Sequence, residues 1–398
     1  MKSERLVMDS ENQSEDGHLD PSIHAWAQYT SDNNATRSSS ATAYVEPSKD
    51  NLHVLLNTYV TRVLPAEGTA DFRGVEFAAD AQSERKQLRA NKEVIIAGGV
   101  IGTPQILLNS GIGPREELDA VGVRTIVNNP SVGKNFTDQV YTNMMFNTTI
   151  QDTDFDLETA LAEWNANRTG PLIMPSNLKN QIVWVRFTDN EIPFVDPTPG
   201  ENSPHVEFYF SQISSHPGFT NGEVPPEAIP TVANLTTIQL ALINLHPTSR
   251  GTITLNNSDP FAYPNVDPGL LSGDTDFAVL REGIKSVQRL FSAPVFAESV
   301  FGSVYPPGSL TTDEELDAFV RAEAAPYLHG GSSASMSPRG ASWGVVDPDF
   351  RVKQTTGLRI VDASVLFILQ PSLPSGHTQA PVYGFVERAS ILIAEEWR

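Results

Sequence analysis

The sequence predicts a mixed α/β (α+β) protein made of two differently built domains. Residues 93–99 form an apolar run that ends in two glycines and leads into a short helical pattern, which is typical of a strand buried on both faces. From about residue 140 the pattern changes to strand-like segments such as 205–210 and 238–242, separated by proline-rich connections, and residues 251–255 alternate at period two. This alternation indicates an antiparallel sheet with one wetter face. The chain of 398 residues also exceeds the size at which a single hydrophobic core usually stops growing.

The composition narrows the classes of function. A net charge of -21 opposes binding to nucleic acid or to an anionic membrane, because both are polyanions. No apolar run approaches the roughly 18 residues that span a bilayer. The sequence has no cysteine, which excludes disulfides, thiolate metal sites and a cysteine nucleophile. We therefore expect no nucleic-acid partner, no membrane partner and no metal site.

The glycine turn is followed by the clearest helix signals in the chain. Thr103 is a good N-cap, and Pro104 suits the first helical position, where its missing N–H is not needed. Gly111 can end this helix in a left-handed conformation. Gly98 and Gly99 let the backbone come close to a ligand or to another element. The sequence therefore predicts a strand, a glycine turn and a short helix.

Other elements follow from their own apolar spacing. Residues 52–64, 74–77 and 358–361 predict further strands. A helix after Asp274 and a last helix opened by Pro381 each have one apolar stripe. The polar residues at the start of the chain, to about position 36, are expected to be loop or poorly ordered tail. The two stripes consist of Phe277, Leu280, Ile284, Val287 and Phe291, and of Val382, Phe385, Val386, Ala389 and Ile393.

Two histidines lie next to glycines near the end of the chain. His329 opens the sequence His-Gly-Gly-Ser, and His377 lies in Ser-Gly-His-Thr-Gln. The pKa of an unperturbed histidine lies close to physiological pH, so a pair of them can handle a substrate proton. Spacing alone leaves a second interpretation open, in which both are loop histidines that bond to backbone carbonyls.

Several stretches together are similar to the glucose-methanol-choline (GMC) oxidoreductase family, and most closely to its fungal aryl-alcohol oxidases. The resemblance runs from about residue 35 to the end of the chain. Two positions depart from the family pattern: Val100 replaces a smaller residue, and Gln139 stands where histidine is usual. The stretches that carry the resemblance are 37–40, 98–113, 132–138, 251–255, 336–349 and 357–364.

The resemblance implies oxidation of the CH–OH group of an alcohol, primary and in some relatives aromatic, with FAD as cofactor and oxygen or quinone as electron acceptor. It implies that His329 is the general base and that His377 hydrogen-bonds the substrate oxygen. It implies a remnant FAD-binding domain at 37–138, a substrate-binding domain at 139–325 and a return to the FAD-binding domain at 326–398. By the same resemblance, FAD is contacted by Val60, Gly98, Gly99, Asp362, Thr378 and Gln379, and the substrate by Phe210 and Leu328. From the sequence alone, Val60 and the glycines could equally be ordinary strand and turn residues, and Asp362 a surface carboxylate.

One family motif is absent from the sequence. GMC enzymes begin with a Gly-x-Gly-x-x-Gly turn whose helix N-terminus faces the FAD pyrophosphate. Residues 111–113 start such a pattern, but Glu116 stands at the place of the third glycine. We therefore expect an incomplete, N-terminally truncated FAD-binding fold that binds FAD poorly or not at all. An inactive truncated fragment is the alternative to an active enzyme.

Two further expectations concern rival chemistry and location. A serine hydrolase is disfavoured: Ser342 lies in a formal Gly-x-Ser-x-Gly, but no buried strand precedes it and no helix follows. No signal peptide is visible, whereas Asn-X-Ser/Thr sequons favour a secreted, glycosylated full-length parent. Three more departures bear on the site: Ser332 replaces a glycine, Ser215 replaces a gating phenylalanine, and residues 367–370 look like an insertion before His377. The sequons begin at Asn12, Asn34, Asn135, Asn147, Asn167, Asn234 and Asn256.

Overall fold

The computed structural model divides into two compact units, which are described separately below. It describes residues 22–25, 34–150, 155–173, 181–188, 195–214, 236–306, 310–366 and 373–398. The first unit takes in residues 1–40, 141–244 and 277–324, and the second takes in 41–140, 245–276 and 325–398. Ser215 and residues 367–370 lie outside the described residues.

The second unit is built on short sheets around one helix. Strands β2 (Tyr59–Pro65), β3 (Phe72–Ala78) and β4 (Lys86–Arg89) form an antiparallel sheet. Strand β5 (Val94–Ile96) pairs in parallel with β16 (Leu358–Ile360), and it leads directly into α1 (Gly99–Asn109). The predicted strands at 74–77, 93–99 and 358–361 are thus confirmed with somewhat different ends. Of the strand predicted at 52–64 only the second half is confirmed, because residues 52–58 form no strand. The remaining elements of this unit are η1 (Ala41–Val45), η2 (Glu46–Ser48), β6 (Ile112–Gly113), α2 (Arg115–Ala120), β7 (Val127–Asn128), β12 (Thr252–Thr254), β13 (Asn265–Asp267), β15 (Ala325–Pro326), η6 (Ala363–Val365) and α6 (Gln379–Glu396).

The start of α1 differs from the prediction, for a reason visible in the packing. The helix begins at Gly99, so Thr103 is not its N-cap and Pro104 lies inside it. A proline inside a helix cannot donate to the carbonyl four residues earlier. That carbonyl, of Val100, instead accepts a bond of 2.6 Å from the Oγ of the buried Ser333. The predicted end is confirmed, because α1 stops at Asn109 and Gly111 has a φ of 75°.

The core of the second unit lies around α1 and the strands beside it. The parallel strands contribute Ile96 and Leu358, and α6 contributes Ala389. Helix α6 begins at Gln379, two residues before the predicted start at Pro381. Of its predicted inner face only Ala389 is buried, and the other apolar members are half-buried. The core consists of Val63, Phe72, Ile96, Leu107, Leu108, Ile112, Leu118, Val127, Val132, Ala334, Met336, Val345, Val346, Phe350, Val352, Leu358, Ile360, Val365 and Ala389.

The first unit is organised around one sheet, with the order β1-β9-β10-β11-β8-β14. The pairs β1/β9, β9/β10, β10/β11 and β8/β14 are antiparallel, as predicted. The segment that alternates at period two, 251–255, lies instead in the second unit, where β12 pairs with β13. Every residue of β11 is buried, so this strand forms the centre of the core. The strands are β1 (Ser22–Ala25), β8 (Val140–Thr148), β9 (Gln181–Val185), β10 (Val206–Ser214), β11 (Thr236–Asn244) and β14 (Val300–Tyr305).

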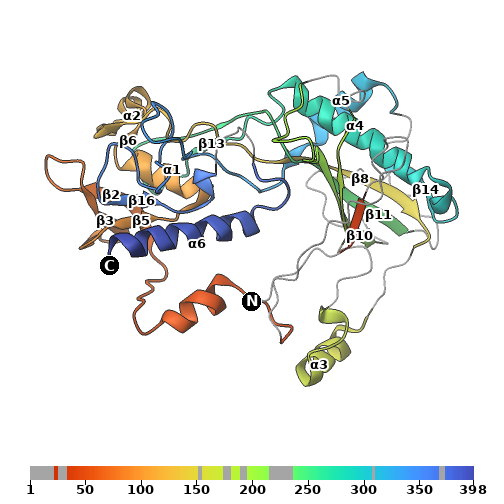
Figure 1. The fold of residues 1–398 in the computed structure, drawn as a ribbon, viewed down its shortest axis with the longest axis horizontal. Coiled ribbons are helices and arrows are strands. Elements are labelled where there is room, and N and C mark those ends of the chain that lie inside the picture. The colour runs from red at the N-terminus through yellow and green to blue at the C-terminus, as the bar shows by residue number, and fades with distance from the viewer. Residues whose placement is uncertain are drawn as a thin grey trace. The chain divides into compact units, whose positions relative to one another are not determined.

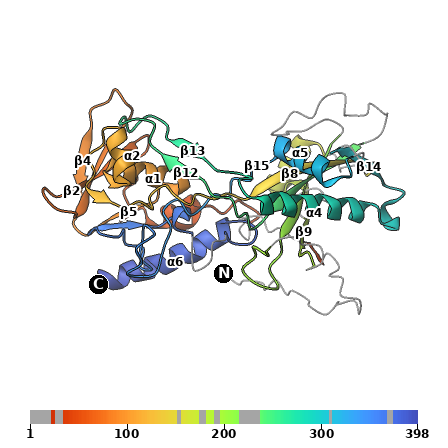
Figure 2. The same ribbon diagram turned by 90° about the horizontal axis from the view of Figure 1, so that it is seen from above.

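Helix α4 (Asp274–Phe291) packs on this sheet through its predicted stripe, and all five stripe residues are buried. Figure 1 and Figure 2 show the helix running beside the strands. A Cβ on Gly283 would lie 2.7 Å from Leu242 Cδ1, so helix and strand touch closely at this glycine. The other helices of this unit are α3 (Leu157–Asn167), η3 (Pro171–Ile173), η5 (Pro294–Phe296) and α5 (Asp313–Glu323).

The predicted fold class, mixed α/β with an antiparallel sheet, is confirmed. The expectation for the start of the chain was wrong at 22–25. This segment forms β1, whose register pairs Ser22 with Trp184 and Ala25 with Gln181. A short edge strand takes its backbone partners from the neighbouring strand, so local polarity did not reveal it. The predicted domain boundaries stay predictions.

Candidate active site

Two backbone segments of the second unit run side by side and position His329. The amide of Gly331 donates to the carbonyl of Thr137 over 2.9 Å, and the amide of Thr137 donates back over 3.2 Å. The amide of Tyr327 donates to the carbonyl of Gln139 over 2.7 Å. Residues 327–331 are therefore held against 137–139 at both ends, with His329 between the two points of attachment.

The carboxylate of Asp138 fixes the backbone turn that carries His329. It accepts a bond of 2.8 Å from the His329 amide. Asp138 is only 5% exposed, and its burial raises the pKa to about 6, against the opposing effect of the backbone donors of His329, Gln139 and Leu328. Leu328 has a φ of 63°, a left-handed conformation that is unusual for leucine. Its side chain is 82% exposed, so backbone bonds rather than packing hold this turn.

Gln139 contacts the segments that carry both predicted catalytic histidines. Its Oε1 lies 2.7 Å from His329 Nδ1, and its Nε2 donates to the carbonyl of Gly376, next to His377, over 3.0 Å. The same Nε2 lies 3.3 Å from the carbonyl of Pro374 and 3.4 Å from that of Leu245. The side chain has no exposure to solvent.

The structure brings the two predicted catalytic histidines together. The ring centroids of His329 and His377 lie 5.0 Å apart, with the rings at 76° to each other. The ring centroid of Tyr327 lies 4.7 Å from that of His329, with the rings nearly perpendicular, and 6.2 Å from that of His377. His377 is exposed and His329 is half-buried, so both rings can meet a solute.

Sequence reasoning missed other polar groups beside this pair. His246 is buried, and its Nε2 lies 2.9 Å from Ser375 Oγ, two residues before His377. Asp138 and Tyr327 were also missed, and Gln139 was noted only as a departure. The sequence carries no periodic signal for these contacts, since they join segments far apart in the chain.

Asp362 is a buried turn residue and not the surface carboxylate that its sequence position allows. Its Oδ2 accepts from the Gly99 amide at 3.1 Å and from the Thr103 hydroxyl at 2.5 Å, and its Oδ1 accepts from the Ser364 amide at 2.7 Å. Thr103 Oγ1 in turn accepts from the Gly98 amide at 3.0 Å. The first amide of α1 therefore already has a partner within the protein.

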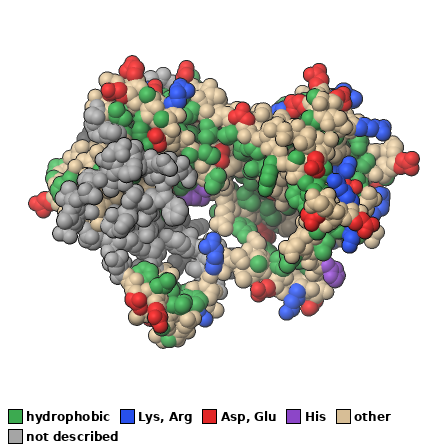
Figure 3. All heavy atoms as spheres, turned by 180° about the vertical axis from the view of Figure 1, so that it is seen from behind, with side chains coloured by type: hydrophobic (Ala, Val, Ile, Leu, Met, Phe, Trp, Pro, Cys, Tyr) green, Lys and Arg blue, Asp and Glu red, His purple; other side chains and the backbone are tan. Residues whose placement is uncertain are grey.

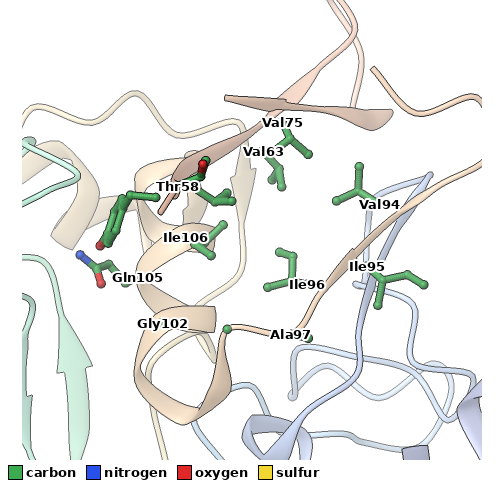
Figure 4. A pocket seen from close by; sticks show the side chains of 13 residues that line it. Thr58, Val63, Val75, Val94, Ile95, Ile96, Ala97, Gly102, Gln105 and Ile106 are labelled. Atoms are coloured by element: carbon green, nitrogen blue, oxygen red, sulfur yellow. The ribbon is translucent and has the colours of Figure 1, made fainter. Parts of the chain in front are cut away.

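A cavity of about 450 Å³ lies beside this glycine turn. Figure 4 shows its wall, with Ile95 and Ile96 from β5, Gln105 and Ile106 from α1, and Val63 from β2. Val60 and Gly98, two of the predicted cofactor contacts, also line it. Several apolar side chains of this unit are exposed to solvent. Figure 3 colours the hydrophobic side chains on one face of the molecule green. The exposed ones include Val54, Leu55, Leu56, Val60, Ile95 and Ile101.

The remaining predicted site residues lie in different surroundings. Thr378 precedes α6 and Gln379 is its first residue, so both follow His377 directly. Leu328 precedes His329 on the exposed turn. Phe210 belongs to the first unit, where it is buried with its ring edge-on to Phe291 at 6.5 Å. Its predicted contact with substrate stays a prediction.

Comparison with known proteins assigns the family. A GMC oxidoreductase N-terminal family model matches residues 9–141, and the corresponding C-terminal model matches 247–385. The chain is 46% identical to pyranose dehydrogenase 3 of Leucoagaricus meleagris, over 100% of this chain and 73% of that protein. The chain belongs to the GMC oxidoreductase family.

Further matches to this GMC chain agree with the assignment. Pyranose dehydrogenase 2 of the same fungus is 51% identical over 94% of this chain and 61% of its own length. A solved fungal aryl-alcohol oxidase superposes with a TM-score of 0.73 at 25% identity, covering 92% of this chain and 65% of that one. The family model reaches residue 9, further toward the N-terminus than the motifs alone indicated.

GMC oxidoreductases use FAD, and the described residues can be tested against its parts. The open, mainly apolar cavity at Val60 and Gly98 suits a flat ring such as adenine. For the diphosphate, the described lining of this cavity contains no lysine or arginine, and the Gly99 amide is bonded to Asp362. The described lining of this cavity therefore suits the adenosine end of FAD and offers no basic side chain to its diphosphate.

Three other predicted features can be located. Residues 337–345 contain no strand and no helix, so the loop around Ser342 is not a nucleophile elbow. Ser332 has a φ of 70°, which explains why glycine is usual there, and its Oγ donates to the Leu366 carbonyl. In the part of the chain that the structure describes, no helix has the length and apolarity to span a bilayer, and no group of metal-ligating side chains was found.

Proposed function

We propose that His329 and His377 remove the hydroxyl proton from an alcohol that is oxidised at its CH–OH carbon. The observation that carries this proposal is the 5.0 Å separation of the centroids of two accessible rings. Gln139 contacts the ring of His329 and the carbonyl of Gly376, the residue before His377. One imidazole can accept the proton while the other donates a hydrogen bond to the same oxygen. FAD, when bound, supplies the acceptor for the hydride.

The need for a base follows from the chemistry of the carbon. A hydride leaves readily only from a carbon that bears an alkoxide-like oxygen, so proton removal must accompany its departure. A positioned base typically contributes about 10²–10⁴-fold to such a step. The protein's part is to hold the base at the correct distance, and the bonds to Asp138 and Gln139 support this role for His329.

For the substrate we propose a pyranose sugar, with an aromatic primary alcohol as the alternative. Two relatives at 46% and 51% identity are named pyranose dehydrogenases, whereas the similarity to the aryl-alcohol oxidase is 25%. Their names also favour an acceptor other than oxygen, and we propose a quinone.

The test is reduction of FAD by the chain with glucose or with a benzylic alcohol, at saturating free FAD and without oxygen. We expect loss of the oxidised flavin absorbance with glucose, and reoxidation by benzoquinone faster than by oxygen. Faster bleaching with the benzylic alcohol would reverse the substrate assignment. No bleaching with either, although FAD is bound, would refute the proposed activity.

The second candidate is a chain without turnover, which the absence of basic side chains from the described cavity lining favours. Calorimetric titration with FAD and with adenosine distinguishes the two cases. If the diphosphate contributes nothing, the two ligands bind with affinities within about tenfold of each other. A much tighter FAD complex would show that the chain has a diphosphate site after all.

We also propose that the parent protein is extracellular and glycosylated. Four sequon asparagines are exposed, whereas Asn147 is half-buried. Peptide mass mapping of protein from a secreting host, before and after removal of N-glycans, is the test. Glycans are expected on the exposed set and not on Asn147, and unmodified peptides throughout would contradict the proposal. The exposed asparagines are Asn34, Asn135, Asn167 and Asn256.

A further inference from the structure

We propose that Gln139 is a positioning residue that keeps a proton on Nδ1 of His329 and thereby leaves Nε2 as the atom that accepts the substrate proton. The inference rests on the proposed function for its consequence in catalysis. Its structural part concerns only the hydrogen bonds within the second unit.

The orientation of the Gln139 amide follows from its surroundings. One end of the amide faces three backbone carbonyls, those of Gly376, Pro374 and Leu245, at 3.0, 3.3 and 3.4 Å. Carbonyl oxygens only accept, so this end must be the NH₂ group, with its two donors. Reversing the amide would place its oxygen against three other oxygens with no donor between them, in a position without solvent. The other end, which faces His329, is therefore the oxygen.

The protonation of His329 follows from this orientation. Gln139 Oε1 has lone pairs and no proton, and it lies 2.7 Å from His329 Nδ1. A hydrogen bond at that distance requires Nδ1 to carry the hydrogen. In the neutral ring only one nitrogen is protonated, so Nε2 is the unprotonated nitrogen and carries a lone pair. Transfer of the hydroxyl proton then breaks the substrate O–H bond and forms N–H at Nε2, which gives an imidazolium that Gln139 still holds at Nδ1.

The same side chain also ties the two histidines to each other. Gly376 precedes His377, is buried, and has a φ of 90°, so the loop enters His377 in a conformation that suits glycine. Its carbonyl is held by Gln139 Nε2. Moving the amide would thus disturb the ring of His329 and the backbone of His377 together. Histidine at this position, the usual family residue, has neither two donors on one atom nor an amide oxygen.

The direct test is ¹⁵N NMR of the full chain labelled at histidine, because two-bond ring correlations identify which nitrogen carries the proton. His329 is assigned by comparison with His329→Gln, and spectra are recorded at a pH where the ring is neutral. Tyr327 and His377 lie against the ring, and Asp138 accepts from the backbone amide of His329, so each spectrum is followed across a pH titration. We expect protonation at Nδ1 in the unmodified chain and a mixture of both neutral forms in Gln139→Met.

The matched control is Gln105→Met. Gln105 is a buried glutamine of the same unit whose Nε2 donates to the carbonyls of Pro260 and Ala262. The control should leave the His329 signals unchanged. If Gln139→Met does not fold, the spectrum of the unmodified chain still decides. Protonation of its His329 at Nε2 would overturn the proposal, and so would an unaltered spectrum in Gln139→Met.

Kinetics separate this inference from the proposed function. With bound FAD, Gln139→Met is expected to lower kcat by on the order of 10²-fold or more with a smaller change in KM, since a base in the wrong tautomer is misaligned rather than absent. Nδ1 protonation without any alcohol oxidation would refute the function and leave the tautomer assignment standing. Alcohol oxidation that depends on His329, together with a proton on its Nε2, would support the function and refute the tautomer assignment.

Discussion

Two regions of the second unit differ in how far their polar groups are satisfied: the segments around His329 and His377 (the histidine end), and the cavity beside Val60 and Gly98 (the nucleotide end). At the histidine end, the polar side chain of Gln139 has partners on both of its atoms, and Asp138 is buried under backbone donors. At the nucleotide end, β5 exposes Ile95, a cavity opens at Val60, and the first helical amide is used by Asp362. The groups proposed to move a proton are thus held by hydrogen bonds within this chain, whereas the described lining of the cavity at Val60 has no basic side chain for the cofactor's diphosphate.

The largest effect is expected at His329. In His329→Ala the rate of FAD reduction by substrate should fall by about 10²–10⁴-fold, because the base is lost. Anaerobic stopped-flow absorbance at saturating FAD measures it. His53→Ala, which alters an exposed histidine of the same unit, is the control and should change nothing. Equal rates of FAD reduction in the two variants would contradict the role of His329 as the base.

The second effect concerns the pH dependence of stability at Asp138. Burial raises the pKa from 3.8 to about 6 in the folded state, so folding favours the protonated form. This contribution is fully present below the unfolded pKa and is lost as the pH rises through about 6. Two pKa units correspond to about 3 kcal/mol.

The comparison with Asp138→Asn isolates that contribution. Between pH 4 and 7 the unfolding free energy of the unmodified chain should fall by up to about 3 kcal/mol more than that of the variant. Urea unfolding at several pH values measures both. If the unfolding free energies of the two proteins changed in parallel with pH, Asp138 would not be a buried acid with a raised pKa.

A smaller effect is expected where α1 meets the histidine segment. In Ser333→Ala the carbonyl of Val100 loses the donor that replaces the missing N–H of Pro104. A buried acceptor left without a partner costs about 1–3 kcal/mol of unfolding free energy. The double variant with Pro104→Ala, which restores a helical donor, should recover part of this loss. Equal losses in the single and double variants would contradict the proposed substitution of one donor for the other.

The smallest effect is expected at the exposed apolar surface. Leu56 is 73% exposed, so Leu56→Ser should change the unfolding free energy by no more than about 0.5 kcal/mol. Leu107→Ser, at a fully buried position of the same unit, should cost several times more. A large loss in Leu56→Ser would show that this surface is packed against something in solution.

Much of the fold follows from local pattern, because periodicity and burial are directly linked. The stripe of α4 is an example, whereas β11 is buried at every position and shows no wetter face. The predicted start of α1 was wrong because Pro104 lies inside the helix. The bond that its missing N–H cannot make to the Val100 carbonyl comes instead from Ser333, more than two hundred positions away. No local rule contains that compensation.

The candidate site was predictable to a smaller extent. Resemblance, not spacing, singled out His329 and His377, and the structure brings their rings together. The role inferred for Gln139 depends on carbonyls from residues near 245 and 375, which only the folded chain brings around one amide. Asp138 is a similar case, since its raised pKa comes from burial that no sequence pattern reports.

The nearness of the two imidazoles can be measured without cofactor or substrate. In the folded chain, ring protons of His329 and His377 should show a mutual nuclear Overhauser effect, because their centroids lie 5.0 Å apart. The signal should persist in Gln105→Met and weaken in Gln139→Met. Absence of any such effect in the unmodified folded chain would contradict the paired arrangement on which the proposed proton transfer depends.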